Sequence, residues 1–236
     1  MASRPRPWIV PPHDPFIKID DDLWTVTGAI PGQTVRRRMV IARRRDGDLL
    51  FFNAVPLRDE ALAELRAWGR FAHVVIPNRF HKIDAHAFRE RLGVRLLCDA
   101  SVADAVRRIA PVDGAPDDLP PDPTVRLVRL HGTRQGETAL VVTGPRGTSL
   151  AFADAVMNVP RGTGGFLSMI LGVSGGPKCP PTFRTLFVAD RDALARDLRA
   201  LADLPDLVRL IPSHGDILEH DPAATLRRIV ARDLGR

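Results

Sequence analysis

The chain has 236 residues, of which 44% are hydrophobic, and this is enough for one large α/β domain with a substantial core. Its formal net charge is +6, and no apolar stretch is long enough for a membrane-spanning helix or the core of a signal peptide. The two cysteines, Cys98 and Cys179, allow at most one disulfide and are too far apart for a CxxC metal site. We therefore expect a cytoplasmic protein with an N-terminal arm over residues 1–21 and a single domain over residues 22–236.

Hairpins, strands and helices are predicted in the first half of the chain. The Asp46-Gly47 pair between two apolar runs predicts a tight hairpin. The run Leu49-Leu50-Phe51-Phe52 is apolar on both faces, as expected for a strand inside a layered sheet. In chain order, strands are predicted over 23–27, 38–44, 49–53, 73–76 and 95–98, and helices over 58–69, 84–92 and 102–109, the last capped by Ser101.

The second half repeats this pattern. Strands are predicted over 124–130, 137–143, 149–154 and 207–211, and helices over 190–204, capped by Asp190, and 222–234. Two such halves predict two sheets packed face to face with helices outside. The competing α/β fold, a doubly wound nucleotide-binding sheet, needs an early glycine-rich turn from a strand into a helix, and Gly28-x-x-x-Gly32 lacks that context.

Residues 160–185 form a long segment with glycines towards both ends. Between the glycines lies a short apolar stretch, Phe166–Leu171. We predict that this stretch is a helix, and that it either covers the functional site as a lid or docks a partner, such as a second copy of the chain.

Three polar side chains follow predicted strands at the point where each strand ends. His81 follows the strand at 73–76, Asp154 closes the strand at 149–154, and His214 follows the strand at 207–211. Loops at strand ends are where layered α/β proteins place their chemistry. We expect these three strand ends to meet at one site.

The order of these features resembles the metallo-β-lactamase superfamily over roughly residues 22–220, and it is most similar to a poorly characterised branch. The motifs that carry the resemblance are Arg38-Met39, Asp46-Gly47, Pro77-Asn78-Arg79-Phe80-His81 and His214-Gly215. The resemblance implies an α+β or α/β fold, a four-layer αββα sandwich of two mixed β-sheets flanked by helices.

The sequence departs from the superfamily's metal motif, H-x-H-x-D-H. Aligned from Pro77 without a gap, its ligand positions hold Asn78, Phe80, Lys82 and Ile83. The family's middle histidine aligns with Thr133, two residues from His131. The bridging carboxylate matches Asp154, the last histidine matches His214, and His81 replaces one histidine only in a shifted register. The resemblance therefore implies one metal ion held by His81, Asp154 and His214, rather than a dinuclear site.

Two imidazoles and one carboxylate with an open position are the ligands of a catalytic Zn²⁺ or a non-haem Fe²⁺. The first hypothesis is therefore a mononuclear metal-dependent hydrolase of a small ester, thioester or phosphodiester, in which Asp84, His86 or Asp216 transfers protons. The second is a non-catalytic member of the fold that binds no metal and acts as a binding or scaffold module.

Nucleic-acid binding is the weaker third hypothesis. It would depend on the runs Arg36-Arg37-Arg38 and Arg43-Arg44-Arg45, whose side chains alternate between the two faces of a strand and so form no continuous groove. We predict that these runs are solvated strand ends. The expected partners are a small-molecule substrate or ligand and a second copy of the chain, with no membrane.

Overall fold

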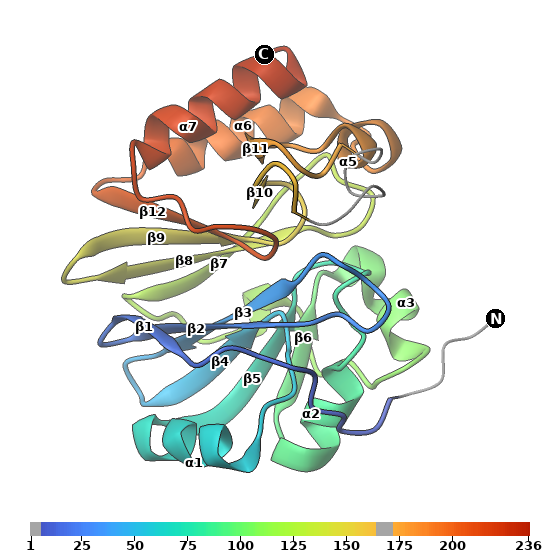
Figure 1. Ribbon diagram of the computed structural model, residues 1–236, viewed down its shortest axis with the longest axis vertical. Coiled ribbons are helices and arrows are strands. Elements are labelled where there is room, and N and C mark those ends of the chain that lie inside the picture. Colours follow the sequence, from blue (N-terminus) through green and yellow to red (C-terminus); the bar gives the residue numbers. More distant parts are fainter. Residues whose placement is uncertain (1–5, 164–171) are drawn as a thin grey trace.

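Two mixed β-sheets lie face to face in the computed structural model, which describes residues 6–163 and 172–236 (Figure 1). The first sheet has six strands in the spatial order β1-β2-β3-β4-β5-β6. The strands are β1 (Ile17–Asp20), β2 (Leu23–Gly28), β3 (Arg37–Arg43), β4 (Asp48–Phe52), β5 (Arg70–Ile76) and β6 (Arg95–Cys98). Neighbours from β1 to β4 run antiparallel, whereas β5 is parallel to both β4 and β6.

The second sheet has four strands in the order β12-β9-β8-β7. Its strands are β7 (Val125–Arg129), β8 (Thr138–Gly144), β9 (Gly147–Phe152) and β12 (Leu207–Pro212). Only the β12–β9 pair is parallel, and the other two pairs are antiparallel hairpins. A separate two-stranded ribbon, β10 (Met157–Val159) with β11 (Gly176–Lys178), lies beside this sheet.

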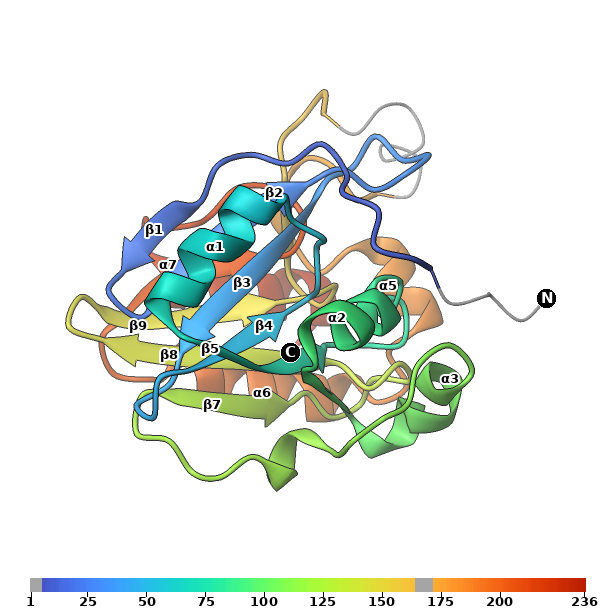
Figure 2. The same ribbon diagram turned by 90° about the horizontal axis from the view of Figure 1, so that it is seen from below.

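Helices cover the outer faces of both sheets (Figures 1 and 2). On the first sheet these are α1 (Asp59–Trp68), α2 (Ala85–Leu92) and α3 (Ala103–Arg107), the last preceded by the 3₁₀ turn η1 (Ala100–Val102). On the second sheet they are α5 (Pro181–Leu186), α6 (Arg191–Ala202) and α7 (Pro222–Ile229), which continues as a π-helical turn η3 (Val230–Leu234). A further 3₁₀ turn, η2 (Pro116–Asp118), precedes β7. The architecture is the predicted four-layer αββα sandwich.

The period-two alternation along the strands divides the core into three layers. In β4, Leu50 and Phe52 face the second sheet, whereas Leu49 and Phe51 pack under the helices, so both faces of this strand are buried as predicted. One layer lies between the two sheets, and the others lie between each sheet and its own helices. The two sheets are therefore held together by a layer of apolar side chains, which fixes their strand ends relative to one another.

Most predicted elements are confirmed to within two or three residues, but some local predictions are wrong or incomplete. The strand β1 lies inside the range predicted as an arm, because Ile17–Asp20 pairs with β2. Asp99, not Ser101, caps the helical turn before α3, and its carboxylate accepts the Ser101 N–H. The strands β10 and β11 and the helix α5 were not predicted. The stretch Phe166–Leu171 lies outside the described residues.

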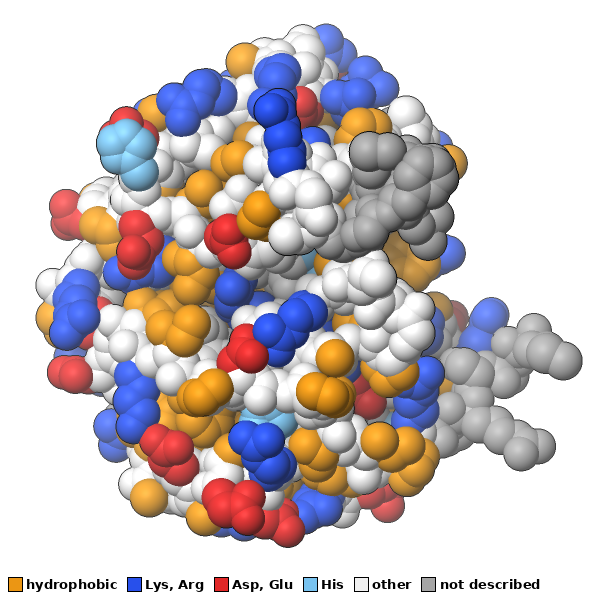
Figure 3. Space-filling model, in the orientation of Figure 1, with side chains coloured by type: hydrophobic (Ala, Val, Ile, Leu, Met, Phe, Trp, Pro, Cys, Tyr) orange, Lys and Arg blue, Asp and Glu red, His pale blue; other side chains and the backbone are white. Residues whose placement is uncertain are grey.

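The prediction that the arginine runs are solvated strand ends holds for Arg36 and Arg45, which are exposed, and is wrong for three of the six arginines. Arg37, Arg38 and Arg44 are all buried, because each has a partner far away in the sequence. Side chains of both signs are interspersed over the face shown in Figure 3, which therefore presents no continuous basic groove. None of the helices in residues 6–163 and 172–236 is long and apolar enough to cross a membrane.

Candidate metal centre

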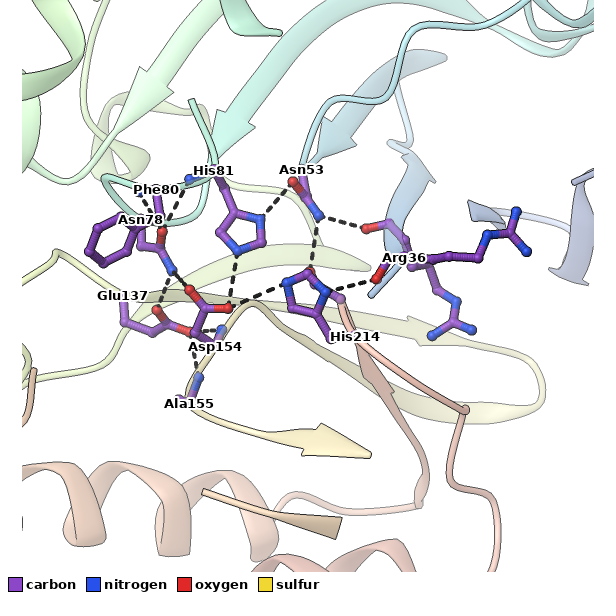
Figure 4. Close-up of polar contacts among 11 residues, drawn as sticks. Arg36, Asn53, Asn78, Phe80, His81, Glu137, Asp154, Ala155 and His214 are labelled. Carbon is purple, nitrogen blue, oxygen red and sulfur yellow. Dashed lines mark hydrogen bonds and ion pairs between the residues drawn. The ribbon is translucent and has the colours of Figure 1, made fainter. Parts of the chain in front are cut away.

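The three predicted strand ends meet at one edge of the sandwich (Figure 4). In the parallel pair β9–β12, Phe152 lies opposite Pro212, so Asp154 and His214 each follow two residues beyond the same row of the sheet. His81 comes from the other sheet, in the loop between β5 and α2. The site is therefore formed from both sheets, and the packing between the sheets determines its geometry.

The three side chains converge closely. The Nε2 atoms of His81 and His214 lie 3.2 Å and 3.5 Å from the same atom, Oδ1 of Asp154. One ligand atom from each of the three residues lies within 4.8 Å of the others. The side chains are 6%, 10% and 14% exposed for His81, His214 and Asp154, so the site is largely buried.

The protonated nitrogen of His81 is fixed by Asn53. The Asn53 side-chain amide donates to the Arg38 carbonyl at 2.8 Å, so its Oδ1 must face His81. The His81 Nδ1–H therefore donates to that oxygen, at 2.8 Å. Asn53 has a left-handed backbone (φ 68°), a conformation that asparagine adopts more readily than most residues. This local turn after β4 directs the amide into the site.

The same argument identifies the protonated ring nitrogen of His214. Its Nδ1 lies 2.8 Å from the backbone carbonyl of Arg36, which can only accept a hydrogen bond, so Nδ1 carries the proton. In both neutral imidazoles the unprotonated nitrogen is then Nε2, the atom that faces Asp154. Metal-binding histidines are held in this way by an acceptor behind the ring.

Three lone-pair-bearing atoms thus point towards one another with no donor between them. Two neutral imidazole nitrogens and a carboxylate oxygen repel at these distances unless a cation or extra protons lie between them. Adjacent ligands of a four-coordinate Zn²⁺ are about 3.3–3.6 Å apart if each lies about 2.0–2.2 Å from the ion. The observed separations of 3.2 Å and 3.5 Å agree with that spacing, so the donor set fits one small divalent ion.

Electrostatics favour the deprotonated forms that a metal ion requires. Burial lowers the pKa of His214, which favours its neutral form. Burial alone would raise the pKa of Asp154, but positive charge between this carboxylate and the two histidines, whether from a proton or from an ion, and the hydrogen bond from Asn78 hold it well below its usual range. Asp154 is therefore ionised, and the site is poised to bind a cation.

A second buried carboxylate, Glu137, supports the Asp154 loop. Its Oε1 accepts the backbone N–H groups of Asp154 (2.7 Å) and Ala155 (2.9 Å). The side-chain amide of Asn78 donates to Glu137 Oε2 and to Asp154 Oδ2, both at 2.8 Å. Burial and the neighbouring Asp154 charge raise the pKa of Glu137 to about 7. Asn78 thus bridges two carboxylates and leaves the other oxygen of Asp154 facing the histidines.

The loop that carries His214 is held by Arg38. The Arg38 backbone N–H donates to Ser213 O (2.7 Å), and its Nη1 donates to Pro212 O (2.8 Å) and Gly215 O (2.7 Å). Gly215 has a φ of 93°, and a Cβ there would lie 1.9 Å from the carbonyl oxygen of Asn158. Only glycine fits at this close approach.

The structure brings together three of the six residues predicted for catalysis and metal binding. Of the other three, Asp216 lies on the loop after His214, where its backbone N–H donates to Asn158 O at 2.8 Å. Asp84 forms a buried ion pair with Arg37. His86 lies on α2 and lines a separate pocket beside Trp8. Within the described residues, neither side chain has a hydrogen bond or ion pair with the three, and a role for them in proton transfer stays a prediction.

The other positions aligned with the superfamily motif also lie apart from the centre. His131 pairs with Asp197, and the Thr133 hydroxyl donates to the Leu130 carbonyl. The Lys82 ammonium donates to the Arg79 carbonyl. The residue that reaches the site from this part of the chain is Glu137, four positions beyond Thr133. No sequence signal marked it, because a single glutamate before a strand is a common surface pattern.

The sequence matches no protein-family model and no curated protein. Solved structures similar to this chain include the DIM-1 metallo-β-lactamase exposed to ceftazidime, at 11% identity and a TM-score of 0.65, covering 95% of this chain and 99% of that one. They also include FIM-1 from Pseudomonas aeruginosa in its mono-zinc form, at 12% identity and 0.63, covering 99% of each chain. A metallo-β-lactamase from Pontibacter korlensis is 13% identical with a TM-score of 0.60, covering 92% of this chain and 99% of that one. The chain therefore has the metallo-β-lactamase fold.

Proposed function

We propose that this chain is a mononuclear metal-dependent hydrolase of a small ester, thioester or phosphodiester. The observation that supports this most strongly is the convergence of two Nε2 lone pairs on the Asp154 carboxylate, with both Nδ1 protons engaged behind the rings. The likeness to FIM-1, whose structure was solved in a mono-zinc form, supports a single ion on this fold. Zn²⁺ fits the donor set, and Fe²⁺ is the alternative.

The chemistry that such an ion supplies is a bound water of lowered pKa and a polarised carbonyl or phosphoryl oxygen. The chain itself does the positioning. Asn53 and the Arg36 carbonyl orient the two imidazoles, and Asn78 holds the carboxylate of Asp154. Asp84 or His86 is proposed to move protons, although the Asp84 carboxylate is paired with Arg37 in this structure.

One observation favours the alternative, a non-catalytic binding or scaffold module. The side-chain amide of Asn78 donates hydrogen bonds to Glu137 and to one oxygen of Asp154, so these two carboxylate oxygens need no ion. A chain that kept the fold without the metal would show such a hydrogen-bonded replacement. The two hypotheses differ in whether an ion is bound by His81, Asp154 and His214.

The hydrolase proposal is tested by turnover. Protein loaded with Zn²⁺ or Fe²⁺ is assayed with 4-nitrophenyl acetate, an acyl thioester and bis(4-nitrophenyl) phosphate, alongside Asp154→Asn and His220→Ala. The latter is a matched control because His220 is an exposed histidine outside the site, with its side chain 97% exposed. We expect turnover of one substrate class that Asp154→Asn abolishes and His220→Ala retains. Equal turnover by Asp154→Asn, or none by the loaded protein on any class, contradicts the proposal.

A further inference from the structure

A second concave region lies outside the metal centre, between the N-terminal arm and the loop from β2 to β3. It encloses about 550 Å³, within the range of small-molecule sites. Six apolar residues line it: Ile9, Val10, Pro11, Pro12, Ala29 and Pro31. None of the three candidate metal ligands is among its lining residues.

The apolar wall of this pocket is exposed where a folded chain would usually bury it. Ile9 and Val10 are 61% and 37% exposed, and they are among the few large hydrophobic side chains left exposed in the described residues. Covering such surface with an apolar ligand gains roughly 25 cal/mol per Å². An exposed apolar surface inside a concavity is typical of a ligand site rather than of scattered surface residues.

The wall is also held in place before any ligand binds. The Trp8 indole N–H donates to Leu57 O at 3.1 Å, and its ring packs against Phe88 on α2. On the far side, the Ala29 N–H donates to Pro12 O at 2.8 Å. The arm is thus fixed on both sides of Ile9 and Val10, so a ligand would not have to order it.

The charged residues that line the pocket, two arginines and one aspartate, leave a net positive charge. Arg37 and Asp84 line the pocket as a buried ion pair, which contributes no net charge. Arg37 Nη2 donates to Asp84, and the Arg37 Nε is buried without a hydrogen-bond partner. Arg6 also lines the pocket and has no ion-pair partner within the described residues. The remaining charge is that of Arg6, which favours an anion.

We propose that this pocket binds a small anion with an apolar body, such as a medium-chain carboxylate, with its charged group towards Arg6 and Arg37. The apolar body would cover Ile9 and Val10 and lie against the prolines of the arm. This site lies beside the metal centre, because Arg37 follows the residue whose carbonyl holds His214. It requires no bound ion, so it goes beyond the proposed hydrolase function.

The proposal is tested by isothermal titration calorimetry on chelator-treated full-length protein. The probes are octanoate, its neutral isostere octanamide, and acetate, which carries the charge without the apolar body. We expect octanoate to bind, octanamide to bind about tenfold more weakly, and acetate not to bind measurably. Failure of octanoate to bind, or equal binding of octanoate and octanamide, overturns the proposal.

Two substitutions test whether octanoate binds in this pocket. Val10→Asp puts a negative charge on the exposed wall and is expected to weaken octanoate binding about tenfold or more. Ile17→Asp is the matched control, since Ile17 is 52% exposed on β1 and does not line the pocket, and it is expected to leave binding unchanged. Equal effects of the two substitutions overturn the assignment. So does octanoate binding that appears only after Zn²⁺ is added, because the carboxylate would then lie at the metal centre.

Discussion

Replacing Arg38 with methionine tests whether this buried guanidinium positions His214. The substitution keeps the backbone N–H that donates to Ser213 O and removes the two side-chain hydrogen bonds to Pro212 O and Gly215 O. Methionine is unbranched and fills a similar space. The carbonyls on both sides of His214 then lose their donor, while the sheet pairing of β3 is unchanged.

The size of the effect follows from these contacts. A hydrogen bond from a charged donor contributes about 1.5–3 kcal/mol, so two contribute about 3–6 kcal/mol. Burial of the guanidinium, which lowers the pKa of Arg38, is a cost that the substitution removes in part. We expect the free energy of unfolding to fall by about 2–4 kcal/mol, and the Zn²⁺ affinity to fall about 10–100-fold, as for other residues that orient metal ligands.

Urea denaturation of metal-free protein measures the first quantity, and competition with a chromophoric zinc chelator measures the second. Arg126→Met is the matched control, because Arg126 is an exposed arginine on β7. The control is expected to stay within about 0.5 kcal/mol of the unsubstituted protein. The reasoning is refuted if Arg38→Met is as stable as the control and binds Zn²⁺ as tightly.

Three further predictions concern buried groups. Asn53→Asp keeps the acceptor for His81 but sets a carboxylate oxygen against the Arg38 carbonyl, so urea denaturation should show a loss of about 1–3 kcal/mol; unchanged stability would contradict the assigned amide orientation. In Glu137→Gln the new side-chain NH₂ group must face another hydrogen-bond donor, either the amide of Asn78 or the backbone N–H groups of Asp154 and Ala155. The substitution should therefore lower the thermal midpoint, and an unshifted midpoint would argue against these hydrogen bonds. Burial raises the thiol pKa values of the two free cysteines to about 11 and about 12, so at mildly alkaline pH neither should react with Ellman's reagent until the protein unfolds; rapid reaction of the native protein would contradict their burial.

The convergence of the three candidate ligands could be predicted because each lies at or after the end of an apolar strand that is recognisable by itself. The runs before Asp154 and His214 are apolar enough to be recognised as buried strands, and their parallel pairing brings the two side chains together. The resemblance to the superfamily then implied the four-layer αββα architecture. The layered architecture follows from the same local signals.

The residues that support the ligands could not be predicted, because their roles depend on contacts between distant parts of the chain. Asn53 and Ser213 are 160 residues apart, and Glu137 acts through backbone N–H groups that begin 17 residues later. Arginine is mostly an exposed residue, so the sequence could not show that Arg37 is buried against Asp84, 47 residues away. Asp84 was predicted as a proton carrier from its nearness to His81 in the sequence, which does not show where its carboxylate points.

The account rests on a cation lying among His81, Asp154 and His214, and metal content measures this most directly. Protein purified without chelator is analysed by mass spectrometry for its metal-to-chain ratio, together with His214→Ala and His220→Ala. We expect about one Zn²⁺ or Fe²⁺ per chain, lost in His214→Ala and kept in His220→Ala. A metal-free protein whose thermal midpoint does not move when Zn²⁺ or Fe²⁺ is added, or equal metal content in both variants, would contradict the account.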